Sequence, residues 1–138
     1  MATRLPKSYN PSDDEQFMNA RQREYFRRKL LSWKDELVRE STQTLQHLQE
    51  DSLQEPDLAD RASVESERSL ELRTRDRERK LISKIDSALR RLEDGSYGYC
   101  EETGEPIGLS RLDARPIATM SIEAQERHEK RERTYRDD

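Results

Sequence analysis

The stretch from Tyr97 to Gln125, YGYCEETGEPIGLSRLDARPIATMSIEAQ, has the closely spaced turns of a small module that a metal ion holds together. Structural zinc sites take four ligands, mostly cysteine and histidine. This stretch contains one cysteine, Cys100, and metal-compatible side chains do not occupy the other three places. The residues alone leave open whether this module lost a zinc ion or never held one.

A second set of chemically active residues is the acidic group in LQEPDLAD, namely Glu55, Asp57 and Asp60. Carboxylates on a narrow projection can perturb a magnesium site or basic groups at close range. The simpler interpretation is that Asp57 makes a turn and Asp60 caps a helix. Without further information, we favour this simpler interpretation.

A third feature is the basic run RTRDRERK at residues 73–80. Such runs are usually solvated helix faces with ion pairs between residues four apart. His47 and His128 lie in charged segments without a second metal donor, so we interpret both as surface residues. Cys100 has no resolving thiol, which favours a packed or partly exposed thiol over a redox sensor. No nucleophile–base pair, phosphate loop or zinc-protease motif occurs, so we expect no enzyme.

The elements that must position these residues are helices. Charged residues make up 41% of the chain and hydrophobic ones 30%, which is too polar for a compact globule of 138 residues. A coiled coil needs only a narrow apolar seam. Two seams with four-and-three spacing are present: Phe26, Leu30, Trp33, Leu37, Thr44 and Leu48, then Leu81, Ile85, Ala88 and Leu92.

The limits of the helices follow from capping signals. Ser12 and Glu15 match a capping box, so the first helix should start near residue 13 and run to about 54. The second should run from an Asp60 N-cap to about Glu93, with Gly95 as its C-terminal cap. The short connection predicts an antiparallel hairpin over 13–95, with its tip near 54–61.

The rest of the chain should gather at the base of this hairpin. Residues 1–12 pack there, and 96–138 form a degenerate zinc-ribbon-like module with turns, a short β-hairpin and a final helix at 121–134 capped by Ser121. The fold class is therefore mainly α. The positions near the tip are small or polar (Ser41, Thr44, Ser63, Ser66), so the tip end should be less stable than the base.

The charge of the chain bears on its partners. The net charge of −4, with interleaved signs, disfavours DNA as the primary partner. No apolar run reaches the ~20 residues that span a membrane, and the start lacks the apolar core of a signal peptide. We expect a cytoplasmic protein. The hairpin covers its own seam, so we also expect a monomer.

Two long motifs carry a family resemblance: LELRTRDRERKLISKIDSALRRLEDGSYGYC and the following EETGEPIGLSRLDARPIA, preceded by PDLADRA. From about Phe26 to the C-terminus, the chain resembles the DksA family of bacterial transcription factors. These factors are relatives of TraR and structural analogues of the Gre factors. The resemblance implies a regulator of the stringent response that enters the secondary channel of RNA polymerase and does not bind DNA sequence-specifically.

The resemblance also explains the module with one cysteine. The four zinc-ligand positions of the family fall at Cys100, Thr103, Ser121 and Ala124, of which only the first is a competent ligand. We therefore expect no zinc. The substitute for zinc is expected to be packing and proline stiffening at Pro106 and Pro116. The packing residues would be Tyr97, Tyr99, Ile107, Leu109, Leu112, Ile117 and Ile122.

Site residues follow from the same resemblance. The tip residues that approach the polymerase active centre match Asp57, Asp60 and Ala62 here. The residues that dock on the channel rim match Arg77, Leu81 and Lys84, although Leu81 fits the hairpin seam equally well.

The alarmone ppGpp, the expected co-regulator, would contact Lys84 and Arg115. A further family lysine is Gln125 here, which predicts a reduced response to ppGpp unless Arg127 substitutes for it.

The leading expectation is thus a transcription factor that modulates initiation through the secondary channel of RNA polymerase. One alternative is a Gre-like factor in transcript cleavage or elongation, whose tip acids hold a second catalytic metal. The other is a structural coiled-coil adaptor with no role at polymerase.

Overall fold

The first helix, α1 (Ala20–Asp51), begins later than the capping box predicts. A computed structural model of the chain describes residues 4–51 and 58–137, with the backbone alone at 48–51, 58–62 and 135–137. The side-chain oxygen of Asn19 accepts the Gln22 N–H at 2.9 Å, so Asn19 is the N-cap. Ser12 and Glu15 instead close a turn, in which the Glu15 N–H donates to the Ser12 carbonyl at 3.1 Å. The predicted start near residue 13 is wrong.

A buried glutamine accounts for the late start. The Gln22 side chain accepts the Met18 N–H at 2.7 Å and donates to the Ser12 carbonyl and to Glu15 Oε2, both at 3.2 Å. These bonds hold the residues before Asn19 in turns that cannot continue the helix. A capping-box pattern carries no information about so distant a partner.

The second helix, α2 (Leu58–Asp94), matches its predicted range to within two residues. Gly95 ends it with φ of +86° and donates its N–H to the Arg91 carbonyl at 3.0 Å, which confirms the predicted cap. Asp60 lies inside the first turn and is not the N-cap, because the helix begins at Leu58.

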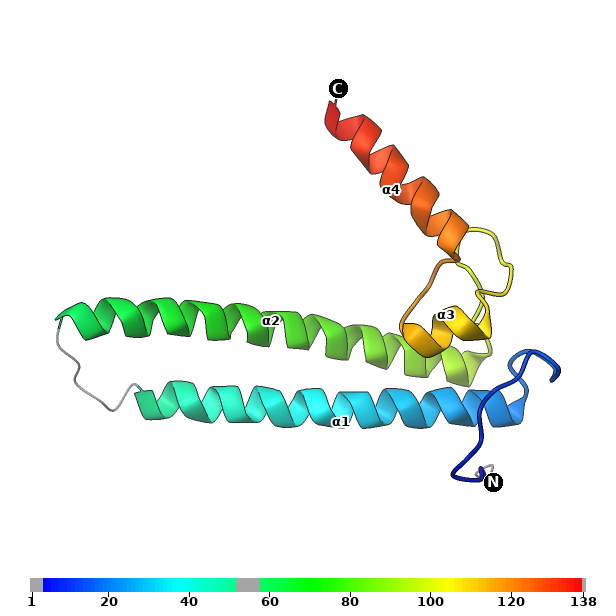
Figure 1. Cartoon of the computed structure of the whole chain (residues 1–138), viewed down its shortest axis with the longest axis horizontal. Helices are drawn as coiled ribbons and strands as arrows, with labels where there is room; N and C mark the ends of the chain where they lie inside the picture. The colour runs from blue at the N-terminus through cyan, green and yellow to red at the C-terminus, as the bar shows by residue number, and fades with distance from the viewer. Residues whose placement is uncertain (1–3, 52–57, 138) are drawn as a thin grey trace. The chain divides into compact units, whose positions relative to one another are not determined.

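Two compact units make up the chain. The hairpin unit comprises residues 31–86, where α1 and α2 run antiparallel (Figure 1). Lys34 Nζ lies 2.7 Å from Asp86 Oδ1, and His47 Nδ1 lies 2.8 Å from Glu71 Oε1. As the residue number rises along α1, the number of its partner on α2 falls, as expected for antiparallel helices. The predicted helical hairpin and mainly α fold are confirmed.

The predicted seams are buried over most of their length. Phe26, Leu30 and Leu37 are buried on α1, as are Ile85, Ala88 and Leu92 on α2. Trp33, Thr44 and Leu81 are half-buried, and the side chain of Leu48 lies outside the described residues.

Towards the tip, the seam of α2 is charged. Ser63 and Ser66 are exposed and do not line it, contrary to our expectation. The positions that turn inward carry Arg68, Glu71, Arg75 and Glu78, spaced three, four and three residues apart, and each has a buried side-chain atom without a hydrogen-bond partner among the described residues.

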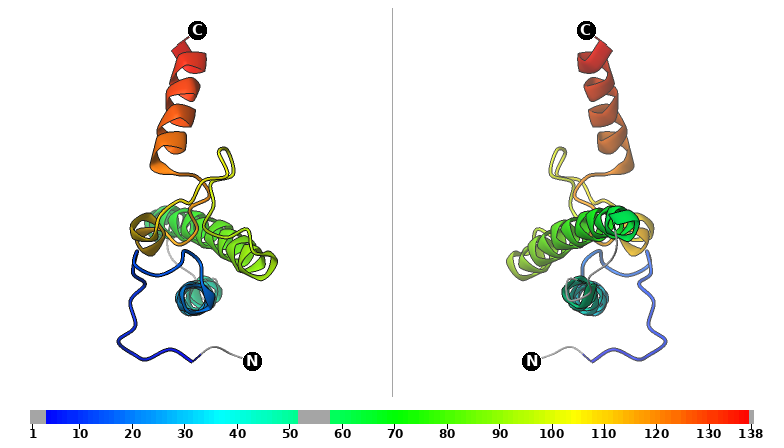
Figure 2. Two further views of the ribbon diagram at one scale, coloured as in Figure 1. Left: turned by 90° about the vertical axis from the view of Figure 1, so that its right-hand side faces the viewer. Right: turned by 90° about the vertical axis from the view of Figure 1, so that its left-hand side faces the viewer.

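The base unit comprises residues 1–30 and 87–138. It contains the short helix α3 (Leu109–Ala114), which the sequence did not predict, and α4 (Ile122–Asp137), whose N-cap is Ser121 as predicted. An isolated antiparallel bridge between Tyr99 and Pro106 lies where the β-hairpin was expected. Figure 2 shows the N-terminal segment passing beside the first turns of α1.

Aromatic and aliphatic side chains form the core of the base unit. The ring of Phe26 lies 5.6 Å from that of Tyr97, and Tyr97, Leu109, Leu112 and Ile117 are all buried. Ile107 is half-buried. Tyr99 and Ile122 are exposed, so their predicted place in this core is wrong. Tyr99 instead makes an edge contact with Phe17 at 5.5 Å.

Candidate functional site

One face of α2 carries the three residues expected to bind a protein rim. Arg77 and Lys84 are exposed and Leu81 is half-buried. Spacings of four and three residues place them on the same side of the helix. Neither cation has an ion-pair partner among the described residues. Leu81 can serve both the hairpin seam and this face, so its two interpretations stay open.

The predicted tip residues are described only in part. Asp57 lies outside the described residues. Asp60 and Ala62 belong to the first turns of α2, but their side chains lie outside the described part of the chain.

The other residues expected to bind a nucleotide belong to the base unit. Arg115 is exposed at the C-cap of α3, where its N–H donates to the Arg111 carbonyl at 2.7 Å. Gln125 donates its side-chain amide to Glu129 Oε1 at 3.1 Å, and Arg127 is exposed one turn into α4. Lys84 lies in the hairpin unit, so the structure does not place it relative to Arg115.

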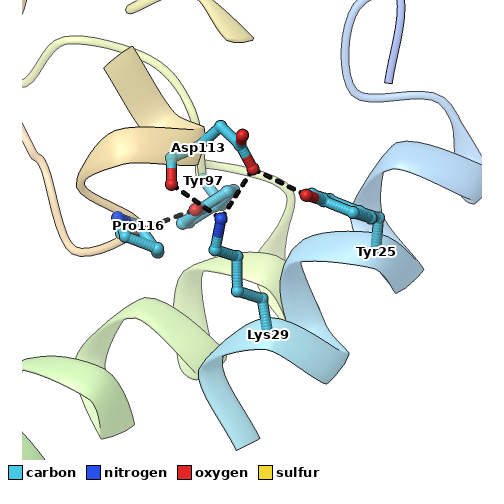
Figure 3. Close-up of polar contacts among 5 residues, drawn as sticks. All are labelled: Tyr25, Lys29, Tyr97, Asp113 and Pro116. Carbon is cyan, nitrogen blue, oxygen red and sulfur yellow. Dashed lines mark hydrogen bonds and ion pairs between the residues drawn. The ribbon is translucent and has the colours of Figure 1, made fainter. Parts of the chain in front are cut away.

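A polar clip fixes α3 against α1 in the base unit (Figure 3). Lys29 Nζ donates to Asp113 Oδ1 at 2.6 Å and to the Asp113 carbonyl at 2.7 Å. The Tyr25 hydroxyl donates to the same carboxylate oxygen at 2.6 Å. These hydrogen bonds hold the pKa of Asp113 below its usual value and, with burial, raise the pKa of Tyr25 to about 12.

A second polar contact lies beside this clip. The buried hydroxyl of Tyr97 donates to the carbonyl of Pro116 at 2.8 Å (Figure 3). Burial raises the pKa of Tyr97, so the hydroxyl stays protonated and can donate at any physiological pH. The bond satisfies the polar end of an aromatic ring whose body packs in the core.

The four former ligand positions still gather around Cys100. Its side chain is buried, with 2% exposed. Burial alone would raise the pKa of the thiol, but hydrogen bonds outweigh it and lower the pKa to about 6. The donors are the Thr103 hydroxyl and the backbone N–H groups of Ser121, Thr103 and Glu102. The Ser121 hydroxyl accepts the Ala124 N–H at 3.2 Å, and the Ala124 side chain is fully buried.

This donor set does not fit zinc. A zinc ion needs about four strong ligands, and here one thiol stands among two hydroxyls and a methyl group. No group of three or more His, Cys, Asp or Glu side chains that could hold a metal occurs among the residues the structure describes. The sulfur accepts hydrogen bonds in place of a metal bond.

The sequence interpretation missed the Tyr25–Lys29–Asp113 clip. Tyr25 and Lys29 are four apart on one helix face, but Asp113 is 84 residues further along the chain from Lys29. Nothing local links them. The low pKa of Cys100 was also missed, because backbone donors leave no mark in the sequence.

Comparisons with known proteins match both parts of the chain. Residues 22–92 match the family model of the DnaK suppressor protein DksA, N-terminal domain, and residues 95–130 match the prokaryotic dksA/traR C4-type zinc finger. The RNA polymerase-binding transcription factor DksA of Caulobacter vibrioides is 72% identical over 94% of this chain and 92% of its own length. Its Escherichia coli K12 counterpart is 46% identical over 91% and 83%.

A solved structure is similar to this chain as well. Transcription factor DksA2 from Pseudomonas aeruginosa superimposes with a TM-score of 0.79 at 50% identity, over 85% of this chain and 90% of that one. The relatives are named as transcription factors, not as enzymes.

Proposed function

Because this chain belongs to the DksA family, we propose that it binds RNA polymerase through the secondary channel and modulates transcription initiation. The observation that carries the proposal is the 72% identity over 94% of the chain to a factor named for binding RNA polymerase. It acts in the cytoplasm, as a monomer, without reading DNA sequence. No helix in the described part of the chain is long and apolar enough to cross a membrane.

We assign three separate roles to the predicted site residues, each according to its chemistry. Arg77 and Lys84 are exposed cations on one face of α2, which suits an acidic rim on the polymerase. The carboxylates of Asp57 and Asp60 act at the catalytic centre, where they perturb magnesium or basic groups at short range. Lys84 and Arg115 hold the phosphates of ppGpp, and their cationic groups pair with its charge.

The zinc-free module serves as a structural base. A metal ion stabilises the fold of a four-cysteine module. Here that stability comes from packing around Tyr97 and Leu112 and from the clip at Asp113. The protein therefore functions in the presence of chelators.

The test is transcription in vitro from a ribosomal RNA promoter with purified polymerase. The arms are the wild type with and without ppGpp, Asp57→Asn/Asp60→Asn, and Gln125→Lys. We expect inhibition that ppGpp deepens, that the double variant loses and that Gln125→Lys strengthens in the presence of ppGpp. Full activity of the double variant would overturn the tip mechanism and favour a structural adaptor.

The same reagents address transcript cleavage. A backtracked complex with labelled RNA should show no cleavage beyond the polymerase alone when the protein is added. Cleavage that depends on Asp57 and Asp60 would move the protein to the Gre-like class.

A further inference from the structure

The outer side of α1 carries a second apolar stripe that the hairpin does not cover. Leu31, Val38 and Leu45 are exposed by 40%, 44% and 36%. They are seven residues apart, so at 3.6 residues per turn they drift by only about 20° from one to the next. They form a straight seam beside the one that faces α2, over about 21 Å at 1.5 Å per residue.

A ridge of α2 borders this stripe on the same side of the hairpin. The ion pair between Lys34 and Asp86 shows which side of α2 faces the stripe. Lys34 lies between Leu31 and Val38 along α1, so Asp86 lies on the side of α2 next to them. Asp86 is one end of a ridge with four-and-three spacing that continues through Ile82, Arg79 and Arg75. A surface hollow of about 410 Å³ lies along it, lined by Asp76, Arg79, Lys80, Ile82, Ser83 and Asp86.

The charged side chains on this side that have no ion-pair partner among the described residues are cationic. Lys34 is neutralised by Asp86, and Arg39 by Asp35 at 2.7 Å. Arg79 is exposed and has no ion-pair partner among the described residues. A surface with leucine-type residues seven apart and a free arginine beside them matches an amphipathic helix with acidic residues along one edge.

The stripe is separate from the predicted rim face. Arg77 is two residues from both Arg75 and Arg79, and Lys84 is two residues from both Ile82 and Asp86. Residues two apart on a helix point about 160° away from each other. The rim face and the ridge that borders the stripe therefore lie on opposite sides of α2.

We propose that the stripe of Leu31, Val38 and Leu45, with Arg79, is a second docking face that takes an acidic-edged amphipathic helix of RNA polymerase. The proposal rests on the proposed function. A second copy of this chain is a poorer occupant, since it would bring the same arginine of each copy together. Three partly exposed side chains also offer far less than the ~1,200 Å² of a stable interface, which suits an accessory contact.

The test begins with the affinity of labelled protein for polymerase. Val38→Ser and Leu45→Ser should each weaken binding about fivefold, because each removes one aliphatic contact. Arg79→Glu should weaken it by a similar factor. Glu36→Ser, at an exposed position on another side of α1, should bind like the wild type. Thermal unfolding should be unchanged in all four, because the mutated side chains are not in the core.

A photo-crosslinker at Val38 then identifies the occupant. Crosslinks to a helical polymerase segment with apolar residues seven apart and acidic neighbours are expected, with none from position 36. Crosslinks only to a second copy, or serine variants that bind like the wild type, would overturn the proposal. Failure of the wild type itself to bind polymerase would instead overturn the proposed function.

Discussion

Cys100 combines two properties that usually exclude each other. Its sulfur is buried, yet its pKa is lowered to about 6 because four donors point at it. Low pKa favours reaction of a thiol, whereas burial blocks access. We interpret the sulfur as a hydrogen-bond acceptor that organises the turn at Glu102 and Thr103 and the start of α4, much as a metal ion would.

A titration of the thiolate by its ultraviolet absorbance tests this interpretation. The folded protein should show a pKa near 6, well below the ~8.5 of a free cysteine. Thr103→Val removes the hydroxyl donor and should raise that pKa. The stability that the thiolate provides should be complete above pH ~8.5 and decline as the pH falls towards 6. A pKa near 8.5 in the wild type would contradict the donor arrangement.

Asp113, unlike Cys100, is partly exposed, and it forms an ion pair with Lys29. Its pKa lies below the usual value, so the stability it adds is present above the unfolded pKa of ~3.9 and is lost as the pH falls through the folded pKa. Because the carboxylate is half exposed, Asp113→Asn should lower the free energy of unfolding at pH 7 by only about 0.5–1 kcal/mol.

Denaturant unfolding at several pH values gives the measurement for this variant. The difference between Asp113→Asn and the wild type should begin to shrink as the pH falls below ~4, the pKa of the unfolded carboxyl group. It should vanish only below the lower pKa of the folded state, where both proteins lack the charge. A difference that stays constant from neutral to acidic pH would show that the carboxylate does not stabilise the base through its charge.

The geometry of the former zinc positions leads to a gain-of-function prediction. Cys100, Thr103 and Ser121 meet through hydrogen bonds, and Ala124 is buried one turn beyond. Thr103→Cys/Ser121→Cys/Ala124→Cys should therefore bind one zinc ion per chain and become sensitive to chelators. Metal analysis and thermal unfolding with a chelator are the measurements. The variant with only Thr103→Cys should bind none. Absence of zinc from the triple variant would show that the frame has moved apart.

At the scale of the elements, the hairpin seam changes character along its length. It is aliphatic at Leu37 and Ile85 and becomes charged from Glu78 towards the tip. Glu78 is 8% exposed, and its Oε2 has no partner in the described part of the chain. A buried carboxylate without full pairing costs stability. The tip half of the hairpin is thus held less firmly than the half near the base.

Replacing that carboxylate should stabilise the hairpin. Glu78→Leu should raise the free energy of unfolding by about 1 kcal/mol and slow hydrogen exchange along residues 64–78. Glu67→Leu, at an exposed position of the same helix, is the matched control and should do neither. Lower stability of Glu78→Leu would show that the glutamate has a favourable partner.

The helices were predictable from the sequence because apolar periodicity and a glycine cap are local signals. Leu30, Ile85 and Gly95 all lie as expected. The start of α1 was not predictable, because Gln22 holds the preceding segment through bonds to residues up to ten positions away. The charged part of the seam was not predictable for a different reason, because apolar periodicity gives no signal at charged positions such as Arg68 and Glu78.

The candidate site was predictable to a different degree. The role of Arg77, Leu81 and Lys84 at the rim is a prediction from the family resemblance, whereas their spacing on one helix predicts only that they share a face. The stripe at Val38 was missed, because the stronger seam one position away accounts for α1 by itself. Contacts such as Lys29–Asp113 depend on the path of the chain and leave no periodic signal.

At the scale of the whole molecule, the two units of the protein have separate roles. The hairpin unit carries the two proposed docking faces, at Arg77 and at Val38, and the base unit keeps its fold by packing and hydrogen bonds. The family frame is retained without the donor set for zinc. Such a protein should tolerate chelators and keep its action on polymerase, since none of the proposed contacts needs a metal.

The most direct test of the central claim is cleavage by iron placed at the catalytic centre of RNA polymerase. Fe²⁺ in place of the active-site Mg²⁺ generates radicals that cut a nearby chain, and end-labelled protein reports where. We predict cuts confined to residues near Asp57 and Asp60, and their loss when Arg77→Ala weakens docking. Cuts in the base, or none with the wild type at saturating concentration, would contradict entry of the hairpin tip into the channel.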